Sequence, residues 1–117
     1  MIGSNSQIGE NSHIANDTII GNNVMMGFEV VMLSVRHRDD MIDIPLIDQG
    51  YYDSKPVKVE DGCWIGARSM LLPGITIGAN SIVAAGSIVT KDVKPFSIYG
   101  GVPAKRISMR KNYNEEN

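Results

Sequence analysis

Hydrophobic residues recur at every sixth position along this chain, in two separate blocks. The first block covers residues 2–32, and the second covers residues 59–89. The aliphatic positions are Ile2, Ile8, Ile14, Ile20, Met26 and Met32, then Val59, Ile65, Leu71, Ile77, Val83 and Val89. An α-helix has a period of about 3.6 residues and an alternating strand a period of about 2, so this pattern predicts neither of them.

A second position of the repeat follows the same period. Four residues after each aliphatic position stands a small or β-branched residue, as Ser6 and Thr18 show in the first block and Ser81 and Val93 in the second. We interpret each hexad as one short strand and one turn, with three hexads closing a triangular coil. Stacked coils of this kind bury a continuous core, so the sequence predicts an all-β solenoid.

Two segments interrupt the period. Residues 34–56 are polar and contain two prolines, so we predict a loop that extrudes from the solenoid between the two blocks. After Pro95 the repeat ends, and residues 96–117 form a C-terminal basic extension that includes a short segment compatible with a helix. The expected organisation is therefore a β-helix over residues 1–95 with an extruding loop, followed by this extension.

The later repeats carry a family resemblance. The repeats and the segment "PVKVEDGCWIGARSMLLPGITIGANSIVAAGSIVTKDVKPFSIYGGVPAKRI" are similar to the hexapeptide-repeat acyltransferases, over roughly residues 2–107. This resemblance implies a left-handed parallel β-helix, whereas parallel crossovers in general are right-handed. It also implies a homotrimer in which acetyl-CoA, the donor substrate, lies in a groove between adjacent subunits, with the active sites at the subunit interfaces.

One of the two histidines is a candidate for catalysis. His13 lies in a hexad turn and is expected to be a solvated surface residue, whereas His37 stands where the loop begins. The segment "SVRHRDDMIDIPL" around His37 resembles the maltose, galactoside and O-antigen O-acetyltransferase branch. In that branch the histidine removes the proton of a sugar hydroxyl, which then attacks the thioester of acetyl-CoA. An imidazole with an ordinary pKa of about 6.5 suits this role.

The resemblance also assigns residues to the donor. Ala67 follows the W-I-G motif, and its backbone amide would steady the oxyanion. Ala85, in the A-A-G-S motif, would let the pantetheine arm pass close to the backbone. Thr90 and Lys91 stand where the family meets the nucleotide end of the donor. Lys105 follows G-V-P-A and would contact phosphate, which a lysine suits as a point charge.

Four other residues have weaker signals. Cys63 occupies a small-residue position of the repeat, so we expect it inside the core, without the adjacent base that a nucleophile requires. Trp64 precedes an inward position, so we predict that it faces outward at a subunit interface. Glu29 and Arg68 stand where the family usually has asparagine, so the resemblance does not specify the acceptor.

Composition narrows the class of partner. The chain has 117 residues, 43% of them hydrophobic, and a net charge of −2, which favours one small globular domain and gives no reason to expect nucleic acid. No apolar run is long enough to span a membrane, and a single cysteine excludes an intrachain disulfide, so we predict a cytoplasmic protein. Six of the eleven basic residues gather in the last third, which suits an anionic ligand: Lys91, Lys94, Lys105, Arg106, Arg110 and Lys111.

The sequence thus predicts an O-acetyltransferase that moves an acetyl group directly from acetyl-CoA to a hydroxyl of a sugar or glycan precursor, with His37 as general base. No metal is predicted, because a zinc hydratase of the γ-carbonic anhydrase type needs three histidine ligands and the chain has two histidines. Two alternatives stay open on the same fold. One is an acyltransferase acting on an amine or an antibiotic, and the other is a non-catalytic β-helix used for binding or as a scaffold.

Overall fold

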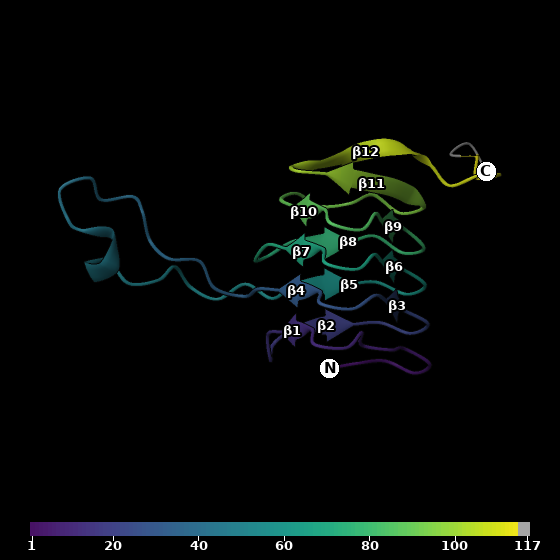
Figure 1. Cartoon of the computed structure of the whole chain (residues 1–117), viewed down its shortest axis with the longest axis horizontal. Helices are drawn as coiled ribbons and strands as arrows, with labels where there is room; N and C mark the ends of the chain where they lie inside the picture. The colour runs from purple at the N-terminus through teal and green to yellow at the C-terminus, as the bar shows by residue number, and fades with distance from the viewer. Residues whose placement is uncertain (115–117) are drawn as a thin grey trace.

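The computed structural model describes residues 1–114 of the chain. Its short strands wind into a stack of coils, from which one long arm projects (Figure 1). The N-terminus lies at one end of the stack, and a C-terminal hairpin covers the other end. Within the part of the chain that the structure describes, no helix has the length and apolar character needed to cross a membrane.

Three parallel sheets form the three sides of a prism. Their two-residue strands are β1 (His13–Ile14), β2 (Ile19–Ile20), β3 (Met25–Met26), β4 (Val31–Met32), β5 (Lys58–Val59), β6 (Trp64–Ile65), β7 (Met70–Leu71), β8 (Thr76–Ile77), β9 (Ile82–Val83) and β10 (Ile88–Val89). The first sheet has the order β1-β4-β7-β10, the second β2-β5-β8, and the third β3-β6-β9. Because Ile14 pairs with Met32, three hexads close one coil, as the sequence predicted.

The aliphatic position of each hexad points toward the axis of the prism. Ile65, Leu71 and Ile77 come from the three sides of one coil, and each is 0% exposed. Burying such a side chain contributes roughly 1.5–3 kcal/mol relative to leaving it in water. Ile2 and Ile8 are the exception, with 53% and 37% exposed, because their coil has a neighbouring coil on one side only.

Small residues allow the corners of successive coils to approach closely. The Ser69 hydroxyl donates to the Ala84 carbonyl at 3.1 Å, which ties one corner to the next coil. A Cβ atom added at Gly66 would lie 2.5 Å from the backbone nitrogen of Ala85, closer than packed atoms permit. The small residues of the repeat are therefore required by the stacking of the backbone at the corners.

The arm leaves the stack between β4 and β5, and it is an ordered hairpin. Near its root the Lys55 N–H donates to the Ser34 carbonyl at 2.8 Å. Further out, the Tyr52 N–H donates to the Arg36 carbonyl at 2.9 Å. These bonds join the two limbs of the arm, which extends to the left of the coils in Figure 1.

A buried glutamine organises the tip of the arm around the 3-10 helix η1 (Leu46–Asp48). The side-chain amide of Gln49 donates to the carbonyls of Met41 and Ile44, at 2.8 Å each, and its oxygen accepts from the Met41 N–H at 3.1 Å. Gln49 is only 6% exposed, so the polar side chain forms the interior of the tip. Apolar side chains consequently lie on its outside, namely Ile42, Ile44, Leu46 and Ile47.

The basic segment after residue 96 forms a β-hairpin. The expectation that it contains a short helix is therefore wrong. Strand β11 (Ser97–Gly101) adds to β9 in parallel, and β12 (Ala104–Met109) returns antiparallel to it. The Ala84 N–H donates to the Tyr99 carbonyl at 2.8 Å. The free edge of β9 thus supplies the backbone hydrogen-bond partners of β11. The local sequence of residues 97–101 does not predict this pairing. Residues 115–117 lie outside the described part of the extension.

Candidate functional site

Three of the residues assigned to the donor lie along one corner of the prism. Ala67 and Ala85 follow β6 and β9, which are neighbours in the same sheet. The Gly101 N–H donates to the Ser87 hydroxyl at 3.2 Å, which holds the turn between β11 and β12 over this corner. Lys105 follows that turn. We name this edge, defined by Ala67, Ala85 and Lys105, the donor corner.

Thr90 and Lys91 lie at a different corner. They follow β10, as the arm follows β4, and both strands belong to the same sheet. Thr90 lines a cavity of about 710 Å³ together with the arm residues Arg36 and Lys55. The structure therefore divides the predicted donor residues into two groups, which the sheet β1-β4-β7-β10 separates.

The backbone amide of Ala67 is available at the donor corner. On either side of it, the Gly66 N–H donates to the Val83 carbonyl at 2.8 Å and the Arg68 N–H donates to the Phe28 carbonyl at 2.9 Å. Among residues 1–114, no acceptor is bonded to the Ala67 N–H between them. A fixed N–H without a partner is the kind of donor that stabilises an oxyanion.

His37 lies on the arm in a defined orientation. Its Nδ1 atom lies 3.0 Å from the carbonyl oxygen of Arg38. A carbonyl can only accept a hydrogen bond, so this contact places a proton on Nδ1, and in the neutral imidazole the lone pair is then on Nε2. The imidazole ring also packs against Tyr51, with 4.8 Å between ring centroids and a tilt of 58°. This tautomer is the one that a general base acting through Nε2 requires.

Two ion pairs flank His37 in the sequence of the arm. Arg36 binds Asp39 at 2.6 Å, and Arg38 binds Asp40 at 3.0 Å. The Tyr52 hydroxyl donates to Asp39 at 2.9 Å. The hydrogen bonds from Tyr52 and Arg36 hold the pKa of Asp39 below its usual value, and Arg38 does the same for the pKa of Asp40. Both carboxylates are therefore ionised at neutral pH, where they fix the two arginines.

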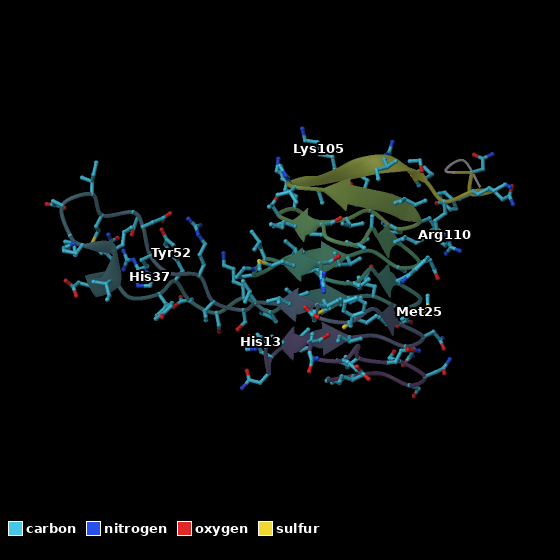
Figure 2. All side chains as sticks on the ribbon, viewed as in Figure 1. His13, Met25, His37, Tyr52, Lys105 and Arg110 are labelled. Carbon is cyan, nitrogen blue, oxygen red and sulfur yellow. The ribbon has the colours of Figure 1, made fainter. Side chains whose placement is uncertain are left out.

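The predicted base does not meet the donor corner of its own chain. Figure 2 shows His37 and Tyr52 on the arm, whereas Lys105 lies on the hairpin at the top of the coils. Points that are well separated in a projection are at least as far apart in space. One chain therefore does not bring His37 and Lys105 together.

Glu29 and Arg68 form an ion pair between successive coils beside Ala67. Arg68 Nε lies 3.5 Å from Glu29 Oε2, and the guanidinium lies 5.3 Å from the centroid of the Phe28 ring. Both residues have positive φ, 54° and 60°, a conformation that asparagine adopts more readily than other non-glycine residues. The sequence singled out these positions but did not indicate that the two side chains pair.

Trp64 faces outward, as predicted, and is 47% exposed. Its partner in the neighbouring strand is Met25, which is 45% exposed. Together they form an apolar strip on the outside of the third sheet. Among residues 1–114, no group of three His, Cys, Asp or Glu side chains is placed to hold a metal ion.

Cys63 is buried and is held as the neutral, unreactive thiol. It is 1% exposed, and its thiol donates to the Gly78 carbonyl at 3.1 Å. Burial raises the pKa of the Cys63 thiol from 9.0 to about 11. The thiolate, which is the nucleophile, is therefore almost absent at neutral pH.

We expect Cys63 in the native protein not to react with an aromatic disulfide reagent at about pH 8, and one thiol per chain to react after unfolding in denaturant. The pKa of the Cys63 thiol is higher in the folded chain than in the unfolded chain. Its contribution to the free energy of unfolding is therefore fully present below pH 9.0, and it is lost as the pH rises to about 11. The absorbance of the released reagent measures the reaction. A full equivalent of thiol reacting before denaturant is added would contradict the burial.

The coils, their sheet order and their small-residue corners define a parallel β-helix built from hexapeptide repeats. The family model described as "Bacterial transferase hexapeptide (six repeats)" matches residues 1–33, and "Hexapeptide repeat of succinyl-transferase" matches residues 56–91. The structure of a maltose O-acetyltransferase from Clostridium difficile 630 is 33% identical, with a TM-score of 0.74 and coverage of 96% of this chain and 68% of that one. The chain belongs to the hexapeptide-repeat transferase family.

Other solved structures agree with this fold. A hexapeptide-repeat-containing acetyltransferase from Vibrio cholerae has a TM-score of 0.84 and 32% identity, covering 95% of this chain and 62% of that one. A galactoside acetyltransferase in complex with coenzyme A has a TM-score of 0.75 and 32% identity, covering 96% and 62%. The left-handed parallel β-helix predicted from the sequence is confirmed.

Curated relatives match over shorter stretches. A putative acetyltransferase from Schizosaccharomyces pombe is 41% identical over 74 residues, which cover 63% of this chain and 35% of the relative. A chloramphenicol acetyltransferase from Agrobacterium fabrum is 37% identical over 67 residues, which cover 57% and 31%. The chain thus spans about a third of the length of these curated relatives.

Proposed function

We propose that this protein is an acetyl-CoA-dependent O-acetyltransferase that modifies a hydroxyl of a sugar or a glycan precursor. The observation that carries the proposal is the state of His37, whose Nδ1 is bonded to the Arg38 carbonyl at 3.0 Å and whose Nε2 is therefore the basic nitrogen. Support comes from the similarity to a maltose O-acetyltransferase and to a galactoside acetyltransferase in complex with coenzyme A. A donor of this kind also suits the predicted cytoplasmic location.

The proposed reaction is a direct transfer. His37 Nε2 takes the proton of the acceptor hydroxyl while the hydroxyl oxygen attacks the thioester carbon of acetyl-CoA. The carbonyl oxygen becomes an oxyanion, which accepts a hydrogen bond from the Ala67 N–H. The carbon–sulfur bond then breaks, and the thiolate of coenzyme A receives the proton from His37. The products are the acetylated acceptor and free coenzyme A.

The remaining site residues would bind the donor. Ala85 is exposed at the donor corner and has no side chain beyond Cβ, so the pantetheine arm can approach the backbone. Lys105 and Lys91 are exposed cations, and Thr90 is an exposed hydroxyl, which suits them to phosphate groups. In this proposal residues 1–95 form the catalytic β-helix and residues 96–117 an extension that adds Lys105 to it.

We place the active site between copies of the chain in a homotrimer. The tip of the arm exposes Ile42, Leu46 and Ile47 by 101%, 62% and 84%. Apolar patches of this kind on a protein surface mark interaction sites. The strip of Met25 and Trp64 is a second such surface. An arm that packs on another copy would carry His37 to a donor corner that its own chain does not offer it.

A panel of acceptors tests the proposed function. Acetyl-CoA is supplied with a sugar, an amine or an antibiotic, and the free thiol of coenzyme A is measured. We expect thiol release with hydroxyl-bearing sugars. Release with chloramphenicol or an amine alone would favour the second candidate, an acyltransferase for such acceptors, which the chloramphenicol acetyltransferase relative supports. Neither thiol release nor a shift in Tm with acetyl-CoA would favour a non-catalytic scaffold.

A further inference from the structure

The cavity at the root of the arm, which we call the arm-root cavity, shares Thr90 with the proposed donor residues, but its arm residues have no role in the transfer step. Its volume of about 710 Å³ is that of a small-molecule site. The arm and the corner after β7 and β10 both contribute to it. Its lining consists of Arg36, Tyr52, Asp53, Lys55, Leu72, Pro73 and Thr90.

Lys55 gives this cavity a fixed cation. The Gly74 N–H donates to the Lys55 carbonyl at 3.0 Å, so the backbone of Lys55 is bound to the coil. The side chain runs over Gly74, since a Cβ added there would lie 3.2 Å from Lys55 Cβ and 3.3 Å from Lys55 Cδ. Among residues 1–114, no carboxylate lies within ion-pair distance of the Lys55 ammonium. The charge is therefore available to a ligand.

Arg36 supplies a second cation on the opposite limb of the arm. Its Nη2 binds Asp39 at 2.6 Å, and its guanidinium lies 5.3 Å from the centroid of the Tyr52 ring. A guanidinium has five N–H donors, so the bond to Asp39 leaves further donors for an anion. The Tyr52 ring, together with Leu72, provides an apolar wall beside the two cations.

The charge of the cavity favours an anion. Its lining includes two cations, Lys55 and Arg36, and one carboxylate, Asp53. Arg36 is paired with Asp39, so Lys55 is the cation of the lining that has no ion-pair partner among residues 1–114. Lys91 follows Thr90 in the chain and is exposed, so it adds a further positive charge at this corner of the prism. A tetrahedral phosphate offers several acceptor oxygens and suits both a guanidinium fork and an ammonium. A small organic phosphate with a flat or apolar body matches this combination of groups.

We propose that the arm-root cavity binds a phosphate group of a small organic phosphate through Lys55 and Arg36, and so holds the arm that carries His37. Arg36 precedes His37 on one limb, and Tyr52 on the other limb is bonded to Arg36 through its backbone at 2.9 Å. A phosphate that joins Arg36 to Lys55 thereby ties both limbs to the coil. The effect of the bound phosphate on the position of His37 rests on the proposed function. Tyr52 would act as a positioning residue, because it links the two limbs of the arm.

The substitution Lys55→Gln tests the site, because it removes the charge and keeps a stem that packs on Gly74. Titration calorimetry at low salt with inorganic pyrophosphate, coenzyme A and UDP gives the three dissociation constants. We expect the variant to bind pyrophosphate about tenfold more weakly, because one charge-assisted hydrogen bond is lost. Lys94→Gln is the matched control, since Lys94 is exposed and does not line the cavity, and it should bind as the unmodified protein does.

The three ligands separate the possible sources of the phosphate. Weaker binding of both pyrophosphate and coenzyme A by Lys55→Gln would assign the cavity to the donor. Weaker binding of pyrophosphate and UDP with unchanged coenzyme A would assign it to a phosphate-bearing acceptor. Unchanged pyrophosphate binding, or none by the unmodified protein, would overturn the proposal. Pyrophosphate binding does not require acetyl transfer, so failure of the proposed reaction would be seen separately.

Hydrogen exchange tests the effect on the arm. In the unmodified protein, pyrophosphate should slow exchange of the Tyr52 and Arg38 amide hydrogens, which bond to the carbonyls of Arg36 and Gly50. At a pyrophosphate concentration near the dissociation constant of the unmodified protein, the slowing should be much smaller in Lys55→Gln. Equal exchange rates with and without pyrophosphate in the unmodified protein would show that the ligand does not hold the arm.

Discussion

Replacing His37 by alanine should lower kcat for acetyl transfer by about two to four powers of ten, the usual contribution of a general base. The Nδ1–H is bonded to the Arg38 carbonyl, so only Nε2 is basic and the proton of the acceptor has one destination. The dissociation constant of acetyl-CoA should stay unchanged, because the residues proposed to bind the donor lie on the coils and the C-terminal hairpin rather than on the arm. Initial rates of thiol release and calorimetry with acetyl-CoA measure the two quantities.

The second histidine provides the control for this variant. His13 lies in strand β1 rather than in the hexad turn that the repeat predicts, but it is exposed as expected and is not part of the proposed site. His13→Ala should therefore retain the rate of the unmodified protein. If His37→Ala kept near-full turnover, His37 would not be the base, whatever the effect on binding.

Replacing Leu71 by alanine should lower the free energy of unfolding by about 2–5 kcal/mol, the range for truncating a fully buried aliphatic side chain. Leu71 is 0% exposed and pairs with Met32 on one side and Val89 on the other. The coils above and below are linked by backbone bonds and cannot move inward to fill the space. Urea denaturation at one fixed protein concentration measures the loss, since assembly would otherwise change the apparent stability.

The neighbouring residue in the same strand is the matched control. Met70 precedes Leu71 in β7 but faces the outside of the sheet and is partly exposed. Met70→Ala should cost much less than Leu71→Ala in a urea titration of the same protein concentration. Equal losses from the two substitutions would contradict the alternation of inward and outward positions on which the prism depends.

The repeat in the sequence was sufficient to predict the β-helix, because each hexad has an aliphatic residue in its strand and a small or β-branched residue four positions later. Ile65, Leu71 and Ile77 occupy the same place in successive hexads and are all buried. The pattern could not predict the hairpin after residue 96, because its partner is the edge of β9, which is formed by residues distant in sequence. The order of the arm was also missed, since it depends on one buried side chain, Gln49, inside a segment without a repeat.

The candidate site was predicted only in part. Ala67 and Ala85 are three hexads apart, so the period alone places them at one corner. The six-residue period also places Thr90 at the next corner, one side of the prism after Ala85. The sequence therefore indicated two groups of donor residues, although the family resemblance assigns them all to one ligand. The tautomer of His37 depends on a backbone carbonyl, and the arm-root cavity depends on the path of the arm. Neither follows from residue types and their spacing.

In the proposed trimer, His37 of one copy serves the donor corner of another copy. Mixing two inactive variants, His37→Ala and Ala85→Trp, and refolding them together in equal amounts tests it, because Ala85 is exposed and a large side chain there would block the donor. A shared site is intact when its arm comes from the Ala85→Trp chain and its donor corner from the His37→Ala chain. The proposal predicts recovery of about a quarter of the unmodified rate, by random assortment in a symmetric assembly. A rate equal to the sum of the two separate variants would contradict it.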